Sequence, residues 1–175
     1  MRKAKTISDL RTQKYKSVSV KDEMRNNLIN KMRSKEQLFK GIIGYEETVI
    51  PQIQNAVLSG QDIVLLGERG QAKSRLIRSL VELLDDEIPV IEGCEINDDP
   101  LNPTCSSCKD LVKKNKGLTP IKWIGKEERY GEKLATPDIT VADLIGEVDP
   151  IKVAEGRYLS DDYTIHYGLI PRSNR

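Results

Sequence analysis

A continuous apolar run that leads directly into a glycine-rich loop constrains the fold of this chain more than any other feature. Residues 62–66 read Asp-Ile-Val-Leu-Leu, and the loop that follows is Gly67-Glu68-Arg69-Gly70-Gln71-Ala72-Lys73-Ser74. Unbroken aliphatic runs of this length are typical of strands that are buried on both faces of a parallel sheet. After the loop, apolar residues recur at helical spacing up to Leu84, and residues 88–91 form a second apolar run. This order predicts a β-α-β unit with a right-handed crossover.

The loop has the spacing of a phosphate-binding (Walker A) loop, and it follows the strand and opens the helix, as such a loop must. Gly67 and Gly70 let the backbone curl so that successive N–H groups point inward at an anion. Lys73 then reaches the β- and γ-phosphates of a nucleotide, and the Ser74 hydroxyl binds the accompanying Mg²⁺. Ala72 stands where a glycine normally precedes the lysine, which predicts a negative φ at this position. The alternative is a glycine-rich turn that binds nothing.

Hydrophobic spacing predicts further elements on both sides of this unit. A helix is expected from Ser19, because apolar residues recur at every fourth position from Val20 to Met32. Another is expected over about residues 46–59, with Pro51 in its first turn and Gly60 as its stop. Residues 1–18 have no clear period, so we expect them to be disordered or loosely docked. The remaining predictions are a helix over 109–116, a strand over 121–124, a helix from Thr140 and a hairpin over 157–170 that turns at 160–162.

The net charge of +1 hides an uneven distribution. Residues 1–40 carry twelve Lys/Arg against four Asp/Glu (+8), residues 41–100 carry four against twelve (−8), and residues 101–175 carry twelve against eleven (+1). A basic arm of this kind suits nucleic acid. It lacks the interleaved aromatic residues and glycines of RNA-binding modules, however. We therefore favour docking of the arm on the acidic middle block, of the same chain or of a neighbour.

Composition excludes several classes of protein. No stretch approaches the roughly 18 consecutive apolar residues of a membrane span. The basic N-terminus is not followed by the apolar run of a secretory signal. Three cysteines cannot all pair, which argues against a disulfide framework. We therefore expect a cytoplasmic protein without a membrane partner.

The three cysteines have the spacing of ligands in a structural zinc site. Cys105 and Cys108 form a C-x-x-C half site, and Cys94 precedes them in a region rich in turn-forming residues. The fourth ligand is not evident. His166, the only histidine, is more typical of an ordinary hairpin residue, and Asp98 or Asp99 are closer in sequence. Three interpretations stay open at this point: a zinc site, free thiols without a metal, and a redox pair of Cys105 and Cys108.

The run from residue 41 to residue 74, GIIGYEETVIPQIQNAVLSGQDIVLLGERGQAKS, resembles the start of an AAA+ ATPase module. It is most similar to the magnesium-chelatase ATPase subunit and its bacterial relatives, close to the MoxR branch. Residues 135–150 resemble the stretch that precedes an inserted hairpin in this family, and residues 168–175 resemble the residues just before its Walker B strand. In such proteins, the segment that matches Ile42, Ile43 and Gly44 contacts the adenine of the nucleotide.

The resemblance covers about residues 20–175 and implies an α/β P-loop NTPase fold of AAA+ type. The parallel sheet would be represented by its incomplete N-terminal half, with a helical N-terminal arm and an inserted hairpin. The expected segments are a basic arm (1–40, with a helix from about 19), a P-loop core (41–93), a cysteine-containing insertion (94–118), and remaining core with a hairpin, ending before Walker B (119–175).

The resemblance also implies a function. It implies an ATPase that couples ATP hydrolysis in a ring homo-oligomer to remodelling of an unidentified partner protein; in the chelatases the work is insertion of Mg²⁺ into a porphyrin. No apolar run ending in Asp-Glu follows Arg175. We therefore expect this chain to be a fragment that binds ATP or ADP with Mg²⁺ but does not hydrolyse ATP.

Two other functions are weighed against this one. The chain could act as a regulatory or nucleic-acid-binding module through its basic arm, or as an assembly piece whose helices serve contacts between subunits. A salt-dependent gel shift that needs residues 1–40 would favour the first. Saturable nucleotide binding that depends on Lys73 would favour the ATPase over both.

Overall fold

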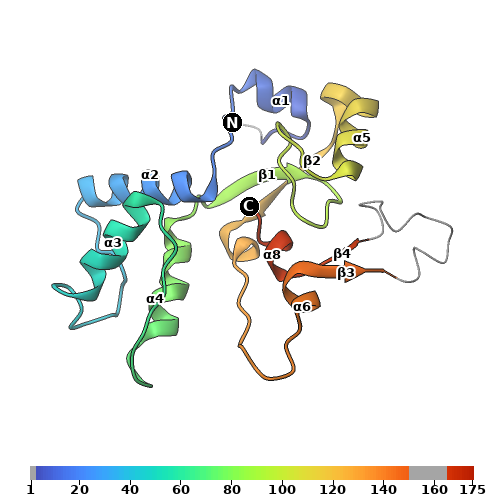
Figure 1. The fold of residues 1–175 in the computed structure, drawn as a ribbon. Helices are drawn as coiled ribbons and strands as arrows, with labels where there is room; N and C mark the ends of the chain where they lie inside the picture. The colour runs from blue at the N-terminus through green and yellow to red at the C-terminus, as the bar shows by residue number, and fades with distance from the viewer. Residues whose placement is uncertain (1–2, 150–164) are drawn as a thin grey trace. The chain divides into compact units, whose positions relative to one another are not determined.

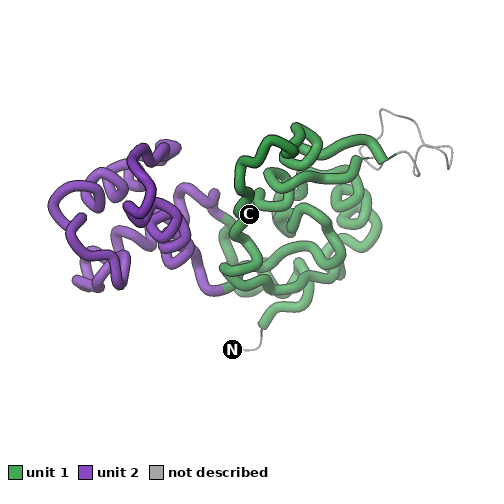
Figure 2. The backbone as a smooth tube through the Cα atoms, turned by 90° about the horizontal axis from the view of Figure 1, so that it is seen from below, with its two compact units in different colours: residues 1–17, 87–175 green, residues 18–86 purple. Residues whose placement is uncertain are grey.

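The chain folds into two compact units. In the computed structural model, which describes residues 3–149 and 165–175, unit 1 comprises residues 1–17 and 87–175, and unit 2 comprises residues 18–86 (Figure 2). The basic N-terminal segment is thus divided between them, with residues 18–40 in unit 2. In the described part of the chain, no helix is both long and apolar enough to cross a membrane.

Unit 2 contains three α-helices, and all three lie where the sequence predicts a helix (Figure 1). Ser19 caps α2 by accepting a hydrogen bond from the Asp22 N–H at 3.1 Å. Pro51 lies in the first turn of α3, where its missing N–H leaves no hydrogen bond unmade, and Gly60 ends this helix. The elements are α2 (Val20–Arg33), α3 (Val49–Ser59), α4 (Lys73–Ser79) and the 3-10 helix η1 (Leu80–Leu83).

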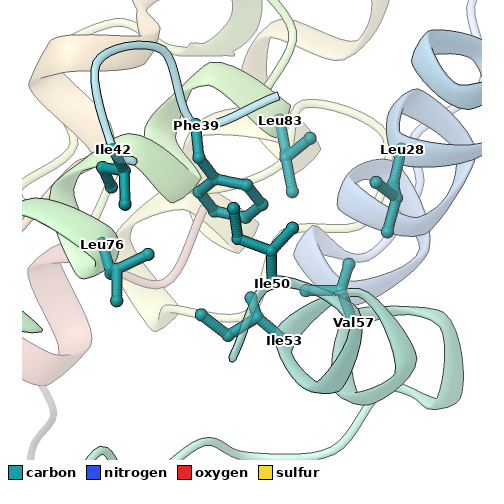
Figure 3. Packing of buried hydrophobic residues seen from close by; sticks show 8 residues of the cluster. All are labelled: Leu28, Phe39, Ile42, Ile50, Ile53, Val57, Leu76 and Leu83. Atoms are coloured by element: carbon teal, nitrogen blue, oxygen red, sulfur yellow. The ribbon is translucent and has the colours of Figure 1, made fainter. Parts of the chain in front are cut away.

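One hydrophobic cluster forms the core of unit 2 (Figure 3). Leu28, from the predicted stripe of α2, is completely buried. The apolar residues of α3 are spaced by three and four positions, so they share one face and pack against it. Phe39 and Ile42 join the cluster from the loop between the two helices. Its buried members are Leu28, Phe39, Ile42, Ile50, Ile53, Val57, Leu76 and Leu83.

The strand predicted at residues 62–66 is not formed, which corrects the sequence-based expectation. Ile63 and Leu65 pack against the core cluster, but Val64 is 81% exposed and Leu66 is 90% exposed. This alternation is that of an extended chain. A strand also needs hydrogen bonds to a neighbour, and no described residue of unit 2 supplies a second strand.

The described residues of unit 1 form two small antiparallel sheets (Figure 1). In the first, β1 (Glu87–Ile91) pairs with β2 (Ile121–Gly125), with Ile88 opposite Ile124 and Val90 opposite Lys122. In the second, β3 (Gly146–Val148) pairs with β4 (Ile165–Tyr167). The helices are α1 (Ile7–Thr12), α5 (Ser106–Asn115), α6 (Val141–Ile145) and α8 (Leu169–Arg172), and the 3-10 helices are η2 (Lys116–Leu118) and η3 (Lys126–Arg129).

The mixed helix and strand content agrees with the predicted fold class, but the predicted parallel sheet is wrong for the described residues. All strand pairs there are antiparallel, and no β-α-β unit forms. Residues 88–91 are a buried strand, as predicted, yet their partner is β2 rather than residues 62–66. The spacing of apolar residues in a sequence indicates which positions are buried, but it does not indicate which strand lies alongside. The pairing of β1 with β2 could therefore not be predicted in this way.

The C-terminal part of unit 1 matches the predictions in part. Thr140 opens α6 with a capping box, in which its hydroxyl accepts from the Asp143 N–H at 3.3 Å. His166 lies in β4, opposite Glu147. The predicted hairpin turn at residues 160–162 lies outside the described residues.

Residues 3–17 are docked in unit 1, contrary to the prediction of disorder or loose docking. Ile7 and Leu10 of α1 are buried in a cluster with Ala4 and Ile121. The preceding segment adds to the edge of β2, because the Ile121 N–H donates to the Lys5 carbonyl at 3.0 Å and the Ile7 N–H donates to the Thr119 carbonyl at 3.2 Å. The helix has only two buried positions, too few for a periodic signal.

We expect Thr6→Ala to lower the free energy of unfolding of unit 1 by about 1 kcal/mol. Thr6 caps α1: its hydroxyl accepts from the Asp9 N–H at 3.3 Å, and its N–H donates to the Asp9 carboxylate at 3.0 Å. Chemical denaturation followed by the fluorescence of Trp123, the only tryptophan, measures the change. Thr136→Ala, in the loop before α6, is the comparison variant, and an equal loss in both would contradict a capping role.

Candidate functional site

The loop of residues 67–74 lies in unit 2 between the extended segment and α4. Gly67 has φ +157° and Gly70 has φ +83°. A side chain at position 67 would meet the Gln71 side-chain oxygen, which would have to move aside, and the φ of this residue is one that residues with a Cβ rarely adopt. Both glycines thus have backbone conformations that are readily accessible to glycine and rare for other residues.

Ala72 departs from the prediction of a negative φ. It is the N-cap of α4 and has φ +53°, in the left-handed region. The backbone must turn sharply from the loop into the helix here, and the Ala72 carbonyl already accepts the Leu76 N–H at 2.9 Å. The left-handed conformation costs a residue with a Cβ about 1–2 kcal/mol. Ala72 adopts the left-handed conformation despite this cost in free energy, because the chain must turn sharply into α4 at this residue.

Lys73 folds back over the loop. Its ammonium group donates to the Gly67 carbonyl at 2.8 Å and also to the Glu68 carbonyl. The charge is therefore held against the backbone at the start of the loop. Glu68, Arg69 and Ser74 are exposed at the surface of the loop.

The residues predicted to contact adenine lie close to this loop but do not share one environment. Ile42 is buried in the core cluster with Leu76, whereas Ile43 is 87% exposed and Gly44 has φ +89°. Tyr45 ties the segment to the loop, because its hydroxyl donates to the Gln71 carbonyl at 3.3 Å. The sequence motif did not single out Tyr45, since an aromatic residue next to Gly44 has no periodic or motif signal.

Positive charge is concentrated at the loop. Residues 41–100 are strongly acidic, and their only four basic residues are Arg69, Lys73, Arg75 and Arg78. All four lie in the loop or in α4. The Arg75 guanidinium lies against Gly41, which places a second cation between the loop and the segment that precedes α3. A local cluster of cations in an acidic block favours binding of a compact anion.

The three cysteines come together in unit 1. Cys94 and Cys105 place their sulfur atoms 3.9 Å apart, and Cys108, in the first turn of α5, is buried beside them. Asp98 completes the group: one donor atom from each of these four residues lies within 4.8 Å of the others. His166 lies in β4, and Asp99 forms an ion pair with Arg175 at 3.1 Å.

Asp98 organises the loop that carries these cysteines. It is 1% exposed, and its carboxylate accepts hydrogen bonds from the N–H groups of Asp99 (2.9 Å), Thr104 (2.7 Å) and Cys105 (2.9 Å). The Thr104 hydroxyl donates a fourth at 3.0 Å. Sequence reasoning identified Asp98 only by its nearness to the cysteines, because a buried carboxylate and a turn-forming one look alike in sequence.

The surroundings of Cys105 and Cys108 favour the neutral thiol over the thiolate. Burial is the main reason that the pKa of Cys105 and that of Cys108 are raised, since it disfavours the thiolate. The neighbouring Cys94 adds to the rise in both. A reactive redox cysteine needs a lowered pKa, so this environment speaks against the redox interpretation.

Comparison with known proteins identifies relatives over part of the chain. No family model and no solved structure matches it. The magnesium-chelatase subunit ChlI homolog of Methanocaldococcus jannaschii is 39% identical over 79 residues, which are 43% of this chain and 21% of that protein. Magnesium-chelatase subunit ChlI-2 of Arabidopsis thaliana is 34% identical over 88 residues (47% and 20%), and subunit ChlI of Nostoc sp. is 35% identical over 82 residues (45% and 21%).

The matched segment spans about one fifth of the length of these relatives. Their identities of 34–39% agree with the resemblance that the motifs of residues 41–74 indicate. Over somewhat less than half of its length, this chain is therefore similar to the magnesium-chelatase subunit ChlI.

Proposed function

We propose that residues 67–74 bind ATP with Mg²⁺ and that the chain is the nucleotide-binding part of an AAA+ ATPase that resembles the magnesium-chelatase subunit. The observation that carries the proposal is the position of Lys73, whose ammonium group lies over the curled loop on the carbonyls of Gly67 and Glu68. Similarity to the ChlI subunits and the cluster of basic residues at the loop support it.

Each part of the loop has a role in this proposal. The backbone N–H groups of the curl hold the phosphates, Lys73 neutralises the β- and γ-phosphates, and the Ser74 hydroxyl takes a position on the Mg²⁺ ion. The segment of Ile42, Ile43 and Gly44 lies near the loop and contacts the base. Tyr45 keeps this segment at a fixed distance from the phosphate loop through its bond to Gln71.

By the same resemblance, we propose that the protein acts in a ring homo-oligomer and that it passes the energy of ATP hydrolysis to a partner protein. Phosphoryl transfer depends mostly on positioning and on electrostatic stabilisation. Lys73 and Ser74 are the residues of this chain that we assign to that task. In this proposal, the partner is a protein on which the ATPase acts.

The alternative of a nucleic-acid-binding arm receives less support. Lys3 pairs with Glu87 within unit 1, and Lys21 pairs with Asp62 at 2.9 Å within unit 2. Both acidic partners belong to the acidic middle block, as docking of the arm on its own chain predicts. Exposed pairs of this kind are worth little energetically, but they reduce the charge that the arm presents to phosphates.

Lys73→Ala is expected to weaken ATP binding by about 10- to 100-fold, because one charge-assisted contact with phosphate contributes about 1.5–3 kcal/mol. Isothermal titration of the full chain with Mg-ATP and Mg-ADP measures it. Lys109→Ala, which removes an exposed lysine of unit 1, is the matched control and should bind like the unaltered chain.

Ala72→Gly provides a second test. Glycine relieves the left-handed conformation at this position, so this variant should bind ATP at least as well as the unaltered chain. Absence of saturable binding by the unaltered chain, or equal affinity in the Lys73→Ala variant, would contradict the proposed function.

A further inference from the structure

We propose that the cysteine cluster of unit 1 is a structural zinc site, in which Cys94, Cys105 and Cys108 bind the ion as thiolates and Asp98 is the fourth ligand. Donor atoms of all four residues lie within 4.8 Å of one another, and Asp98 and Cys108 are buried. The site lies in unit 1, whereas the nucleotide loop lies in unit 2. It therefore goes beyond nucleotide binding, and neither proposal depends on the other.

The spacing of the sulfur atoms suits a tetrahedral ion. Two sulfurs that each lie about 2.3 Å from a tetrahedral zinc are about 3.8 Å apart. The Cys94 and Cys105 sulfurs are 3.9 Å apart. The backbone around them is already ordered by hydrogen bonds, because the Cys94 N–H donates to the Ile91 carbonyl at 3.3 Å and the Lys109 N–H donates to the Cys105 carbonyl at 3.0 Å. Little rearrangement is therefore needed for the three sulfurs to meet one ion.

The start of α5 favours negatively charged sulfur. Cys105 is the N-cap of this helix, and its sulfur accepts the Cys108 N–H at 3.3 Å. Cys108 itself lies in the first turn of a helix of 10 residues. Both sulfurs of the C-x-x-C pair thus lie at the positive end of the helix dipole, which stabilises thiolates once a cation displaces their protons.

Asp98 is placed to supply the remaining ligand. An ionised carboxylate offers about four lone-pair positions, and four hydrogen bonds occupy them here. Three of the donors are backbone N–H groups that are fixed in the loop. The fourth is the Thr104 hydroxyl on Oδ1, which can rotate away without movement of the backbone. We infer that Oδ1 exchanges this hydroxyl for the ion, while the N–H groups continue to orient the carboxylate.

Metal analysis of the purified full chain tests the proposal directly. About one equivalent of zinc per chain is expected after removal of loosely bound ions. Replacement of zinc by Co²⁺ should give the visible bands of a tetrahedral ion together with a sulfur-to-cobalt charge-transfer band. Because that band grows with the number of bound thiolates, Cys108→Ser should lower it by about one third.

Three further variants separate the effects of metal ligation from those of loop structure. Asp98→Asn should shift the visible cobalt bands but keep the charge-transfer band of three thiolates. Glu95→Gln changes an exposed acid in the same loop and should leave both unchanged. Thr104→Val removes the hydroxyl and should still bind one equivalent of metal.

Several results would overturn the proposal. Zinc well below one equivalent, together with no charge-transfer band on addition of Co²⁺, would leave the cysteines as free thiols. A Cys105–Cys108 disulfide in the native chain, detected by mass spectrometry without reductant, would favour the redox pair. Cobalt bands that Asp98→Asn does not shift would remove Asp98 from the ligand set.

Discussion

Replacement of Asp98 by alanine is expected to lower the free energy of unfolding of unit 1 by about 3–4 kcal/mol. The side chain is 1% exposed and accepts four hydrogen bonds, three of them from backbone N–H groups of its own loop. Alanine leaves these buried donors without an acceptor, and an unpaired buried donor costs more than an ordinary hydrogen bond contributes.

The measurement is chemical denaturation in the presence of a chelator, so that no bound ion contributes to stability. Trp123 lies in β2, and its indole N–H donates to the Ala4 carbonyl at 2.9 Å, so its fluorescence reports on unit 1. Glu95→Ala, an exposed position in the same loop, should change stability by less than about 0.5 kcal/mol. A loss below about 1 kcal/mol for Asp98→Ala would show that the loop does not depend on this carboxylate.

The second large effect is expected in unit 2, where Leu28→Ala should cost about 3–5 kcal/mol. Leu28 is completely buried in the cluster with Phe39, Ile50 and Val57. Removal of its three outer carbons loses their transfer free energy and leaves a cavity that neighbouring helices fill only in part. Unit 2 is small, so this loss is a large part of its whole stability.

Hydrogen exchange of the full chain, read by mass spectrometry, locates the effect of Leu28→Ala. Peptides from α2 and α3 should lose protection, because opening of the cluster exposes both helices. Met32→Ala is the matched control: it lies one turn further along α2, but it is 45% exposed. Similar loss of protection in both variants would mean that the cluster does not hold these helices together.

Local signals explain which elements could be predicted from sequence. Helix α2 has a regular apolar stripe and a serine cap, and α3 has its proline in the first turn and its glycine at the end. These features act through hydrogen bonds and packing within a few residues, so they are visible in the sequence itself. Helix α1 was missed because its two buried residues are a weak pattern, and its docking onto residues 119–121 is a long-range event.

The phosphate loop and the cysteine cluster also differ in how far they could be predicted from the sequence. The glycines and lysine of the phosphate loop have a fixed spacing, because the loop is built from consecutive residues. Asp98 has no such signal. Its importance depends on burial and on the donors that the fold of its loop directs at it, and neither is encoded by spacing alone.

The sequence alone determined the positions of the main helices of unit 2, the phosphate-loop motif and the similarity to the magnesium-chelatase subunit. Only the tertiary structure decided the pairing of β1 with β2, the unpaired state of residues 62–66 in the described part of unit 2, and the meeting of three cysteines with Asp98. The physical reason is the range of the interactions. Caps, turns and helical stripes depend on near neighbours, whereas a strand partner or a ligand set joins residues far apart in the chain.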